Sequence, residues 1–225
     1  MATVVVGGSN RGVGKTALIC GLIAALPEFR WTAIKITGHD HGQPKPVWEE
    51  TEPGQGTDTA RYLAAGAERS LLLASSPEQL VWRLRSSLQM CCHPERSLAR
   101  CLRQTESKDL HLGGLTDAMN FRERRLGQLV SLFLQDKAQH PNLIFESNSI
   151  LQYLKPELCL AVADGSGAEP KPSFALAMDQ ADALVVRAAK DGMVECPRPL
   201  FHLAALERIS PEMQSWLRTK LQPNP

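Results

Sequence analysis

A glycine-rich stretch near the N-terminus constrains this chain more than any other feature. Residues 8–16 read Gly-Ser-Asn-Arg-Gly-Val-Gly-Lys-Thr, directly after the apolar run Thr3–Val6 and directly before the apolar segment Ala17–Leu26. A short buried strand, a glycine-rich turn and a helix that opens with Lys-Thr form the arrangement of a phosphate-binding P-loop. The sequence therefore predicts a nucleotide-binding P-loop at residues 8–16.

The residue types in this stretch suit a triphosphate. Glycines let successive backbone N–H groups converge on phosphate oxygens, and the helix N-terminus adds a partial positive charge. The ammonium of Lys15 can reach the β- and γ-phosphates, and the hydroxyl of Thr16 can bind Mg²⁺. We therefore expect GTP or ATP together with Mg²⁺, held by Gly8, Ser9, Asn10, Arg11, Gly12, Val13, Gly14, Lys15 and Thr16.

The spacing departs from the commonest P-loop at two positions. The pattern G-x-x-x-x-G-K-[ST] would place its first glycine at Ser9, and Gly8 lies one residue early. Residues 12–16 are closer to the deviant loop K-G-G-x-G-K-[ST], whose signature lysine would fall on Asn10. The signature lysine would make a second cationic contact to the phosphates, and Arg11 is the candidate for that contact here.

Composition sets limits on the class of protein. A chain of 225 residues is large enough for one good core, so we expect a single domain over residues 1–225. A net charge of +1 argues against bulk electrostatic binding to nucleic acid or to an acidic membrane. With no apolar run of roughly 18 residues and no leader-like N-terminus, we expect a cytoplasmic protein outside the membrane. Six scattered cysteines suit reduced thiols.

Short apolar runs alternate with helical patterns along the chain. They are rich in Val, Ile and Leu, as expected of parallel strands that are covered on both faces. The alternation predicts an α/β fold of the P-loop type, a doubly wound and mostly parallel sheet with helices on both faces. Helices are expected between Thr57-Asp58 and Gly66, over 120–139 and after Ser210-Pro211. The expected strands are Thr3–Val6, Thr32–Ile36, Ser70–Ala74, Leu143–Phe145, Leu158–Ala163 and Ala183–Val186.

Two segments interrupt this rhythm. Residues 43–56, rich in proline, glycine and glutamate, predict a mobile loop that is either a lid or a linker. Residues 88–115 show neither helical nor strand periodicity and predict a disordered or repeat-derived insertion. The alternative for the second segment is a metal site formed from Cys91, Cys92, His93, Cys101 and His111. These residues include no C-x-x-C pair, the spacing that is typical of zinc sites.

Further polar residues follow the predicted strands at the edge where α/β proteins bind ligands. Lys35 and the loop 38–42 follow the second strand, so Lys35 is a candidate phosphate contact and Asp40 a candidate Mg²⁺ ligand or catalytic group. His39 and His41 are candidates for contacting an acceptor or shuttling protons. The alternative is a polar loop that faces solvent.

Two further acids complete the predicted site. Asp58 stands at a helix start and is either a cap or a ligand of Mg²⁺ or substrate, with Arg61 one turn later. Glu146 ends an apolar strand, as a Walker B acid does, and is placed to hold Mg²⁺-bound water or to polarise an attacking water. The predicted catalytic set is Lys15, Asp40 and Glu146, and the predicted metal set is Thr16, Asp40, Asp58 and Glu146.

Taken together, these motifs resemble the MobB family of molybdopterin-guanine dinucleotide biosynthesis. The resemblance rests on residues 8–16, on Lys35 with its histidine-containing loop, on Asp58-Thr59-Ala60-Arg61 with Ala65-Gly66-Ala67, and on Glu146. It implies a GTP-binding, usually dimeric P-loop protein that assists the guanylyltransferase of molybdenum-cofactor synthesis, with weak NTPase activity. The family often has Glu-Gly-Phe-Lys where this chain has Glu146-Ser147-Asn148-Ser149, and no Asn-Lys-x-Asp base-reading motif is present.

Two other classes of protein share parts of this pattern. The first resembles dethiobiotin synthetase, an ATP-dependent enzyme in which Lys35 and residues 38–42 would bind the acceptor. The second is a metallochaperone-type NTPase with His39 and His41 as metal ligands. Nucleotide preference and metal content distinguish these classes from the adapter.

Overall fold

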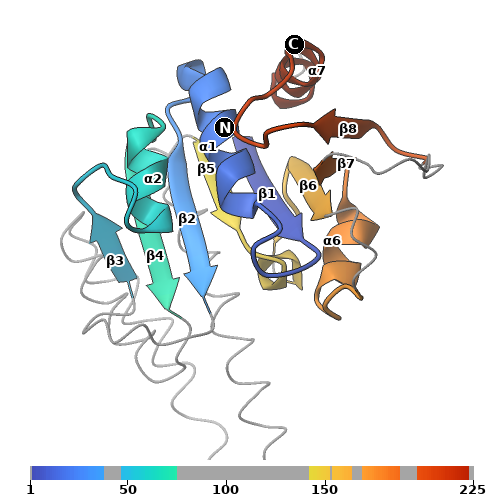
Figure 1. Cartoon of the computed structure of the whole chain (residues 1–225), viewed down its shortest axis with the longest axis horizontal. Helices are drawn as coiled ribbons and strands as arrows, with labels where there is room; N and C mark the ends of the chain where they lie inside the picture. The colour runs from blue at the N-terminus through green and yellow to red at the C-terminus, as the bar shows by residue number, and fades with distance from the viewer. Residues whose placement is uncertain are drawn as a thin grey trace, which may run out of the picture.

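The chain folds around one sheet of eight strands. In the computed structural model, the described residues are 2–37, 47–74, 142–152, 154–163, 169–187 and 197–222. The strand order is β3-β4-β2-β5-β1-β6-β7-β8, and every neighbouring pair is parallel except β3 with β4 (Figure 1). The strands are β1 (Ala2–Gly8), β2 (Thr32–Thr37), β3 (Val47–Glu50), β4 (Arg69–Ala74), β5 (Asn142–Glu146), β6 (Leu158–Ala163), β7 (Ala183–Arg187) and β8 (Leu200–Leu203).

The central strands are buried on both faces. In β1 all seven residues are buried. Successive side chains of a strand point to opposite faces, so Val4 and Val6 join one hydrophobic cluster while Val5 joins the other. Each such side chain contributes about 1.5–3 kcal/mol when it is fully buried. The expected continuous apolar strands of an α/β sheet are therefore confirmed.

Helices pack against both of these clusters. One cluster includes side chains from α1 (Lys15–Ala25), α2 (Asp58–Ala64) and α7 (Pro211–Leu221). The other includes side chains from α6 (Phe174–Gln180) and the 3₁₀ helix η2 (Ser149–Gln152). Figure 1 shows α1 and α2 in front of the sheet. A second 3₁₀ helix, η1 (Pro27–Phe29), leads from α1 toward β2.

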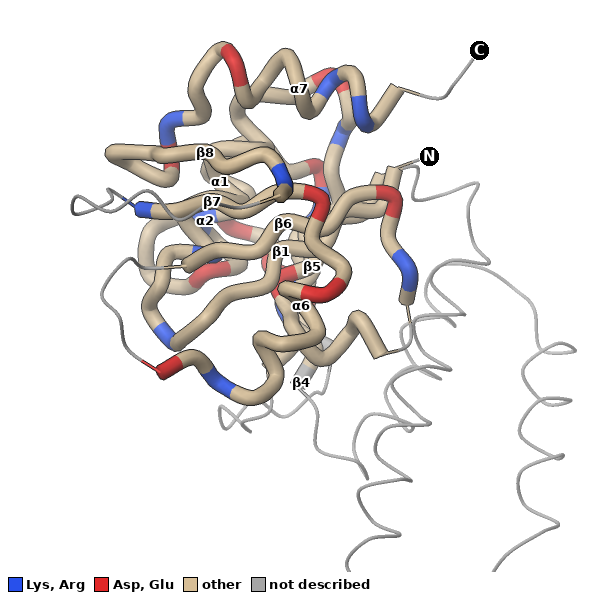
Figure 2. The backbone as a smooth tube through the Cα atoms, turned by 90° about the vertical axis from the view of Figure 1, so that its right-hand side faces the viewer, with Lys and Arg blue, Asp and Glu red and all other residues tan. Residues whose placement is uncertain are grey.

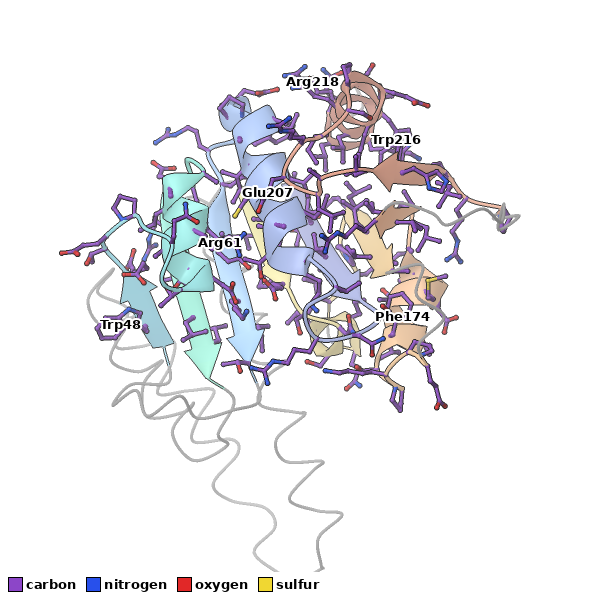
Figure 3. All side chains as sticks on the ribbon, in the orientation of Figure 1. Trp48, Arg61, Phe174, Glu207, Trp216 and Arg218 are labelled. Atoms are coloured by element: carbon purple, nitrogen blue, oxygen red, sulfur yellow. The ribbon has the colours of Figure 1, made fainter. Side chains whose placement is uncertain are left out.

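Helix α1 lies in the centre of its layer. Its buried residues Leu18, Ile19, Leu22 and Ile23 leave it without a polar face toward the core. Helix α7 buries Met213, Leu217 and Leu221 in the same cluster, and Trp216 stacks at a tilt on Phe201 of β8 with ring centroids 5.3 Å apart (Figure 3). The C-terminal part of the chain is thus integral to the core on the α1 side.

The expected helix signals are confirmed where the structure describes them. Thr57 caps α2 through its hydroxyl, which accepts the Ala60 N–H at 3.0 Å. Ser210 caps α7 by accepting the Met213 N–H at 3.2 Å, and Pro211 occupies the first turn. The predicted helix over 120–139 and the predicted insertion over 88–115 lie outside the described residues.

The prediction of a loop over the whole of 43–56 was wrong in part. Val47–Glu50 form β3, an antiparallel edge strand on β4. Glu49 anchors it through two contacts to Arg69 of β4, 2.7 Å to Nε and 3.0 Å to Nη2. An edge strand pairs with a neighbour on one side only and faces solvent on the other, so it needs few apolar residues. The prolines and glutamates around β3 therefore made this segment look like a loop in the sequence.

Charge is mixed over the molecule. Figure 2 shows acidic and basic positions interspersed along the described backbone, in keeping with the net charge of +1. Among the described residues, no helix combines the length and the apolar character that crossing a bilayer requires.

Candidate phosphate-binding site

The glycine-rich loop, residues 8–16, joins the carboxyl end of β1 to the start of α1. Gly12 and Gly14 adopt positive φ angles of 77° and 103°, a region that L side chains rarely enter. A Cβ at Gly14 would also collide with Cδ1 of Leu206, which packs over the loop. Any other residue at position 14 would therefore introduce backbone strain and a clash with Leu206.

The first turn of α1 is open for an anion. Within the described residues, α1 has no side-chain cap and no acidic residue in its first turn. The first backbone N–H groups of a helix have no partner inside the helix, and the helix dipole places partial positive charge there. A phosphate group is the kind of ligand that such a helix start accepts.

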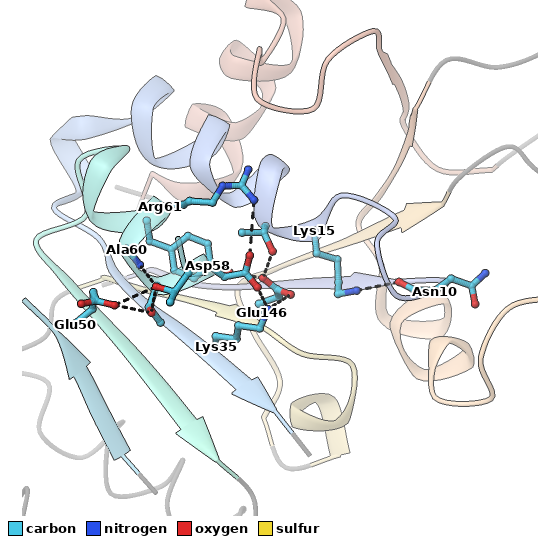
Figure 4. A network of polar contacts seen from close by, with 12 residues as sticks. Asn10, Lys15, Lys35, Glu50, Asp58, Ala60, Arg61 and Glu146 are labelled. Carbon is cyan, nitrogen blue, oxygen red and sulfur yellow. Dashed lines mark hydrogen bonds and ion pairs between the residues drawn. The ribbon is translucent and has the colours of Figure 1, made fainter. Parts of the chain in front are cut away.

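Lys15 bends over the loop. Its Nζ donates to the carbonyl oxygen of Asn10 at 3.1 Å (Figure 4). Burial lowers the pKa of Lys15, and the positive charges of Lys171 and Lys35 lower it further, while the carboxylate of Glu146 acts in the opposite direction. The field around Lys15 is thus one in which an added anion would be stabilising.

Glu146 is the centre of the polar network. It is the last residue of β5, only 7% exposed, and its register neighbours are Val6 of β1 and Lys35 of β2. Its Oε2 accepts the Thr16 hydroxyl at 2.8 Å and also the hydroxyl of Tyr62, and its Oε1 lies 3.3 Å from Nζ of Lys35. Three donors from three elements therefore hold one buried carboxylate.

Asp58 joins the network through Lys35. Its carboxylate pairs with Nζ of Lys35, and its other oxygen lies 3.7 Å from Arg61 (Figure 4). Because Thr57 is the cap of α2, Asp58 is the first helical residue and its side chain is not the cap. Of the two roles considered for Asp58, the geometry favours the one at the polar site.

Arg61 links this site to the C-terminal part of the chain. Its Nη2 lies 3.0 Å from Oε1 of Glu207. Figure 3 labels both residues. Glu207 and Leu206 also pack their carbonyl groups against Gly21 of α1, where an added Cβ would lie 2.9 Å from either oxygen. The segment after β8 therefore supports both helices that border the site.

Asn148 holds the start of the glycine-rich loop. Its Oδ1 accepts the Gly8 N–H at 2.8 Å, and its Nδ2 donates to the Gly8 carbonyl at 3.0 Å and to Oγ of Ser173 at 3.2 Å. In the sequence this residue stood out as part of the departure from the Glu-Gly-Phe-Lys pattern. Its position two residues after a strand that ends in an acid is the signal that it borders the site.

Tyr62 was not singled out by its sequence context. It is fully buried, and burial followed by the charge of Glu146 raises the pKa of its hydroxyl well above the ordinary value of 10.0. A buried tyrosine on an apolar helix face resembles an ordinary core residue. The signal that could have found it is its spacing of four from Asp58, which places both side chains on one side of α2.

The remaining predicted residues fall into three groups. Ser9 is 5% exposed, with a hydroxyl that has no hydrogen-bond partner in the described structure, while its carbonyl accepts the Lys171 N–H at 3.0 Å. Val13 is buried in the core, whereas Arg11 is exposed. Asp40, His39 and His41 lie outside the described residues.

A scan of protein-family models and a search of curated proteins each find no match for this sequence. Within the described ranges, no group of three or more His, Cys, Asp or Glu side chains is placed to share a metal ion. Among the described residues, Thr16 and Glu146 are the directly paired oxygen donors next to the loop, at 2.8 Å. The function is inferred from these contacts.

Proposed function

We propose that this chain is a P-loop protein that binds a nucleoside triphosphate, GTP or ATP, together with Mg²⁺. The observation that carries the proposal is the 2.8 Å contact between the hydroxyl of Thr16 and the carboxylate of Glu146. Thr16 lies in the first turn of α1 and Glu146 at the end of β5, 130 positions apart in the sequence. They meet because β1, which leads into α1, pairs with β5 in the sheet. A hydroxyl after the loop lysine, facing an acid at a neighbouring strand end, is the pairing that P-loop proteins use for Mg²⁺.

The phosphates would occupy the loop and the helix start. Backbone N–H groups of residues 12–16 supply donors, and the positive φ angles at Gly12 and Gly14 turn the backbone there. The ammonium of Lys15, now on the Asn10 carbonyl, would move to the β- and γ-phosphates. The lowered pKa of Lys15 would return upward as the anion arrives.

The donor set suits Mg²⁺, which prefers oxygen ligands. Thr16 and Glu146 would hold it, and Asp58 and Asp40 are the further acidic candidates. When bound, it would neutralise charge on the β- and γ-phosphates. Lys35 lies between Glu146 and Asp58, so it is the candidate second lysine for a loop that has Asn10 at the signature position.

Hydrolysis is expected to be slow. Oε2 of Glu146 already accepts two hydroxyl groups, and Oε1 faces an ammonium, so the carboxylate is a poor general base. Slow turnover suits an adapter that carries bound nucleotide to a partner. The narrower form of the proposal is therefore a cytoplasmic MobB-like homodimer that binds GTP and assists a guanylyltransferase of molybdenum-cofactor synthesis.

The test is calorimetric titration with non-hydrolysable GTP and ATP analogues, each with and without Mg²⁺. Binding that Lys15→Ala abolishes and Lys155→Ala leaves unchanged supports the proposal, since Lys155 is an exposed lysine outside the network. A preference for GTP supports the adapter, and a preference for ATP contradicts it while leaving the P-loop assignment intact. Absence of binding to either analogue contradicts the whole proposal.

A further inference from the structure

Tyr62 contributes a single polar atom to a site that its ring does not enter. The ring belongs to the core cluster formed with α1 and β1, and the residue has no measurable exposure. Its hydroxyl donates to Oε2 of Glu146. A phenylalanine would fill the core equally well, so the hydroxyl serves the carboxylate.

The hydroxyl of Tyr62 is one of two donors that hold Oε2 of Glu146. Oε2 accepts both Tyr62 and Thr16, which use its two lone pairs. On the other side, Lys35 attracts Oε1 from 3.3 Å and is itself paired with Asp58. The carboxylate is therefore held between two hydroxyls on one oxygen and an ammonium on the other.

We propose that Tyr62 is a positioning residue that keeps Glu146 against Thr16 and thereby sets the Mg²⁺ dependence of nucleotide binding. This inference rests on the proposed function. Without the Tyr62 hydroxyl, Glu146 has one donor fewer on the Thr16 side, and the attraction of Lys35 draws the carboxylate toward β2. Loss of a partner that orients a metal ligand typically lowers metal affinity by about 10–100-fold.

The effect is specific to the metal-dependent part of binding. In the described structure the hydroxyl of Tyr62 bonds to Glu146, whereas Lys15 bonds to the Asn10 carbonyl, so affinity for nucleotide in the absence of Mg²⁺ is expected to stay within about twofold of wild type. A residue that served only the fold would change both parts together. The ratio of the two affinities therefore separates positioning from structural support.

The experiment compares wild type with Tyr62→Phe. Mg²⁺ is titrated into each protein at a fixed concentration of the preferred non-hydrolysable analogue, and nucleotide affinity is also measured in chelator. We expect the Mg²⁺ concentration at half-saturation to rise about tenfold in the variant. Ser70→Ala is the matched control, because it removes another buried hydroxyl, one in β4 without a partner in the described structure, and should change neither affinity.

A second comparison links the effect to Glu146. In a Glu146→Gln background the carboxylate is absent, so adding Tyr62→Phe should leave the Mg²⁺ dependence unchanged. If Tyr62→Phe weakens the Mg²⁺ dependence of Glu146→Gln further, the inference is overturned. It is also overturned if the Mg²⁺ titration of the single variant Tyr62→Phe matches that of wild type. Equal loss of both affinities assigns Tyr62 to the fold and likewise overturns it. If wild type itself binds no nucleotide, the proposed function fails, and that outcome is visible before any variant is made.

Discussion

The side-chain amide of Asn148 pairs with both backbone groups of Gly8. Its oxygen accepts the Gly8 N–H at 2.8 Å and its nitrogen donates to the Gly8 carbonyl at 3.0 Å, and the same nitrogen reaches Ser173 beside α6. This amide completes the hydrogen bonding of β1 at its last residue, where the loop begins. The glycine-rich loop is thus fixed at its start by a residue that follows β5.

Asn148→Ala is expected to destabilise the protein and weaken nucleotide binding. Two lost hydrogen bonds to backbone correspond to about 1–3 kcal/mol of unfolding free energy. Because the loop itself loosens, nucleotide affinity should fall about equally with and without Mg²⁺, in contrast to Tyr62→Phe. Denaturant unfolding and calorimetric titration measure the two effects.

The matched control for Asn148 is Gln180→Ala. Gln180 also donates its amide to a backbone carbonyl, that of Leu151 at 3.0 Å, but it does not touch the loop. The substitution Gln180→Ala should lower the free energy of unfolding by about 1 kcal/mol and leave nucleotide affinity unchanged. Equal affinities for Asn148→Ala and wild type would show that the amide supports only the fold.

Gly14→Ala is expected to be much more destabilising than Gly12→Ala. Both positions have positive φ, so each alanine introduces roughly 1–2 kcal/mol of backbone strain. A Cβ at Gly12 meets no atom within 4 Å, whereas one at Gly14 collides with Leu206. The collision adds about 1–3 kcal/mol of overpacking.

The double variant Gly14→Ala/Leu206→Ala separates strain from collision. Leu206→Ala alone is expected to lower stability by about 2–5 kcal/mol. Together, the two changes should destabilise less than the sum of the single changes by about 1–3 kcal/mol, because the collision is relieved. Chemical denaturation of the four proteins measures the coupling, and strict additivity would show that Leu206 does not restrict position 14.

The strands could be predicted from sequence because the sheet is covered on both faces. That condition requires nearly continuous apolar runs, and runs such as Thr3–Val6 and Leu158–Ala163 are hard to mistake. The same reasoning failed at β3, where an edge strand carries Glu49 and Glu50. It also failed at α6, a short helix inside a segment rich in proline and alanine.

The polar network around Glu146 was predictable to a similar extent. Polar residues next to apolar strands and helices stand out in the sequence, because burying an unpaired polar group costs free energy. This criterion selected Lys15, Thr16, Lys35, Asp58 and Glu146. The structure brings all five together within the described residues. Tyr62 was missed because a buried aromatic residue satisfies the apolar pattern of its helix, and no pattern reveals where its hydroxyl points.

The thiols of Cys20 and Cys159 are expected to react slowly in the folded protein. Burial raises the pKa of Cys20 from 9.0 to about 11, and burial followed by the charge of Asp182 raises that of Cys159 to about 12. At about pH 8, roughly one Cys20 in a thousand would be thiolate. Alkylation mapped by peptide mass spectrometry should label both cysteines in denaturant and spare both under native conditions.

The same shifts fix the sign of a pH effect on stability. A thiol whose pKa is raised by folding keeps its proton longer in the folded state, so stability falls once the pH exceeds the ordinary thiol value of 9.0. Unfolding measured from neutral to alkaline pH should show this fall between 9.0 and about 11, and Cys20→Ala should reduce it. Rapid native labelling of Cys20 would contradict the raised pKa of its thiol.

Alanine variants of Ser9 and Ser70 test whether an unpaired hydroxyl in the glycine-rich loop lowers the stability of the protein but contributes to nucleotide binding. Their hydroxyls are buried without hydrogen-bond partners in the described structure, Ser9 inside the loop and Ser70 in β4. An unsatisfied buried hydroxyl destabilises a protein by about 1–3 kcal/mol. Ser9→Ala and Ser70→Ala should therefore each raise the midpoint of denaturant unfolding.

The two variants should differ in nucleotide binding. If the Ser9 hydroxyl is kept unpaired so that it can donate to a phosphate oxygen, Ser9→Ala should weaken nucleotide affinity about tenfold, the value of a hydrogen bond to a charged group. Ser70→Ala should bind as wild type does. Stabilisation of both variants with unchanged affinity in both would remove Ser9 from the phosphate contacts. A less stable Ser9→Ala would instead show that the hydroxyl already bonds a protein group.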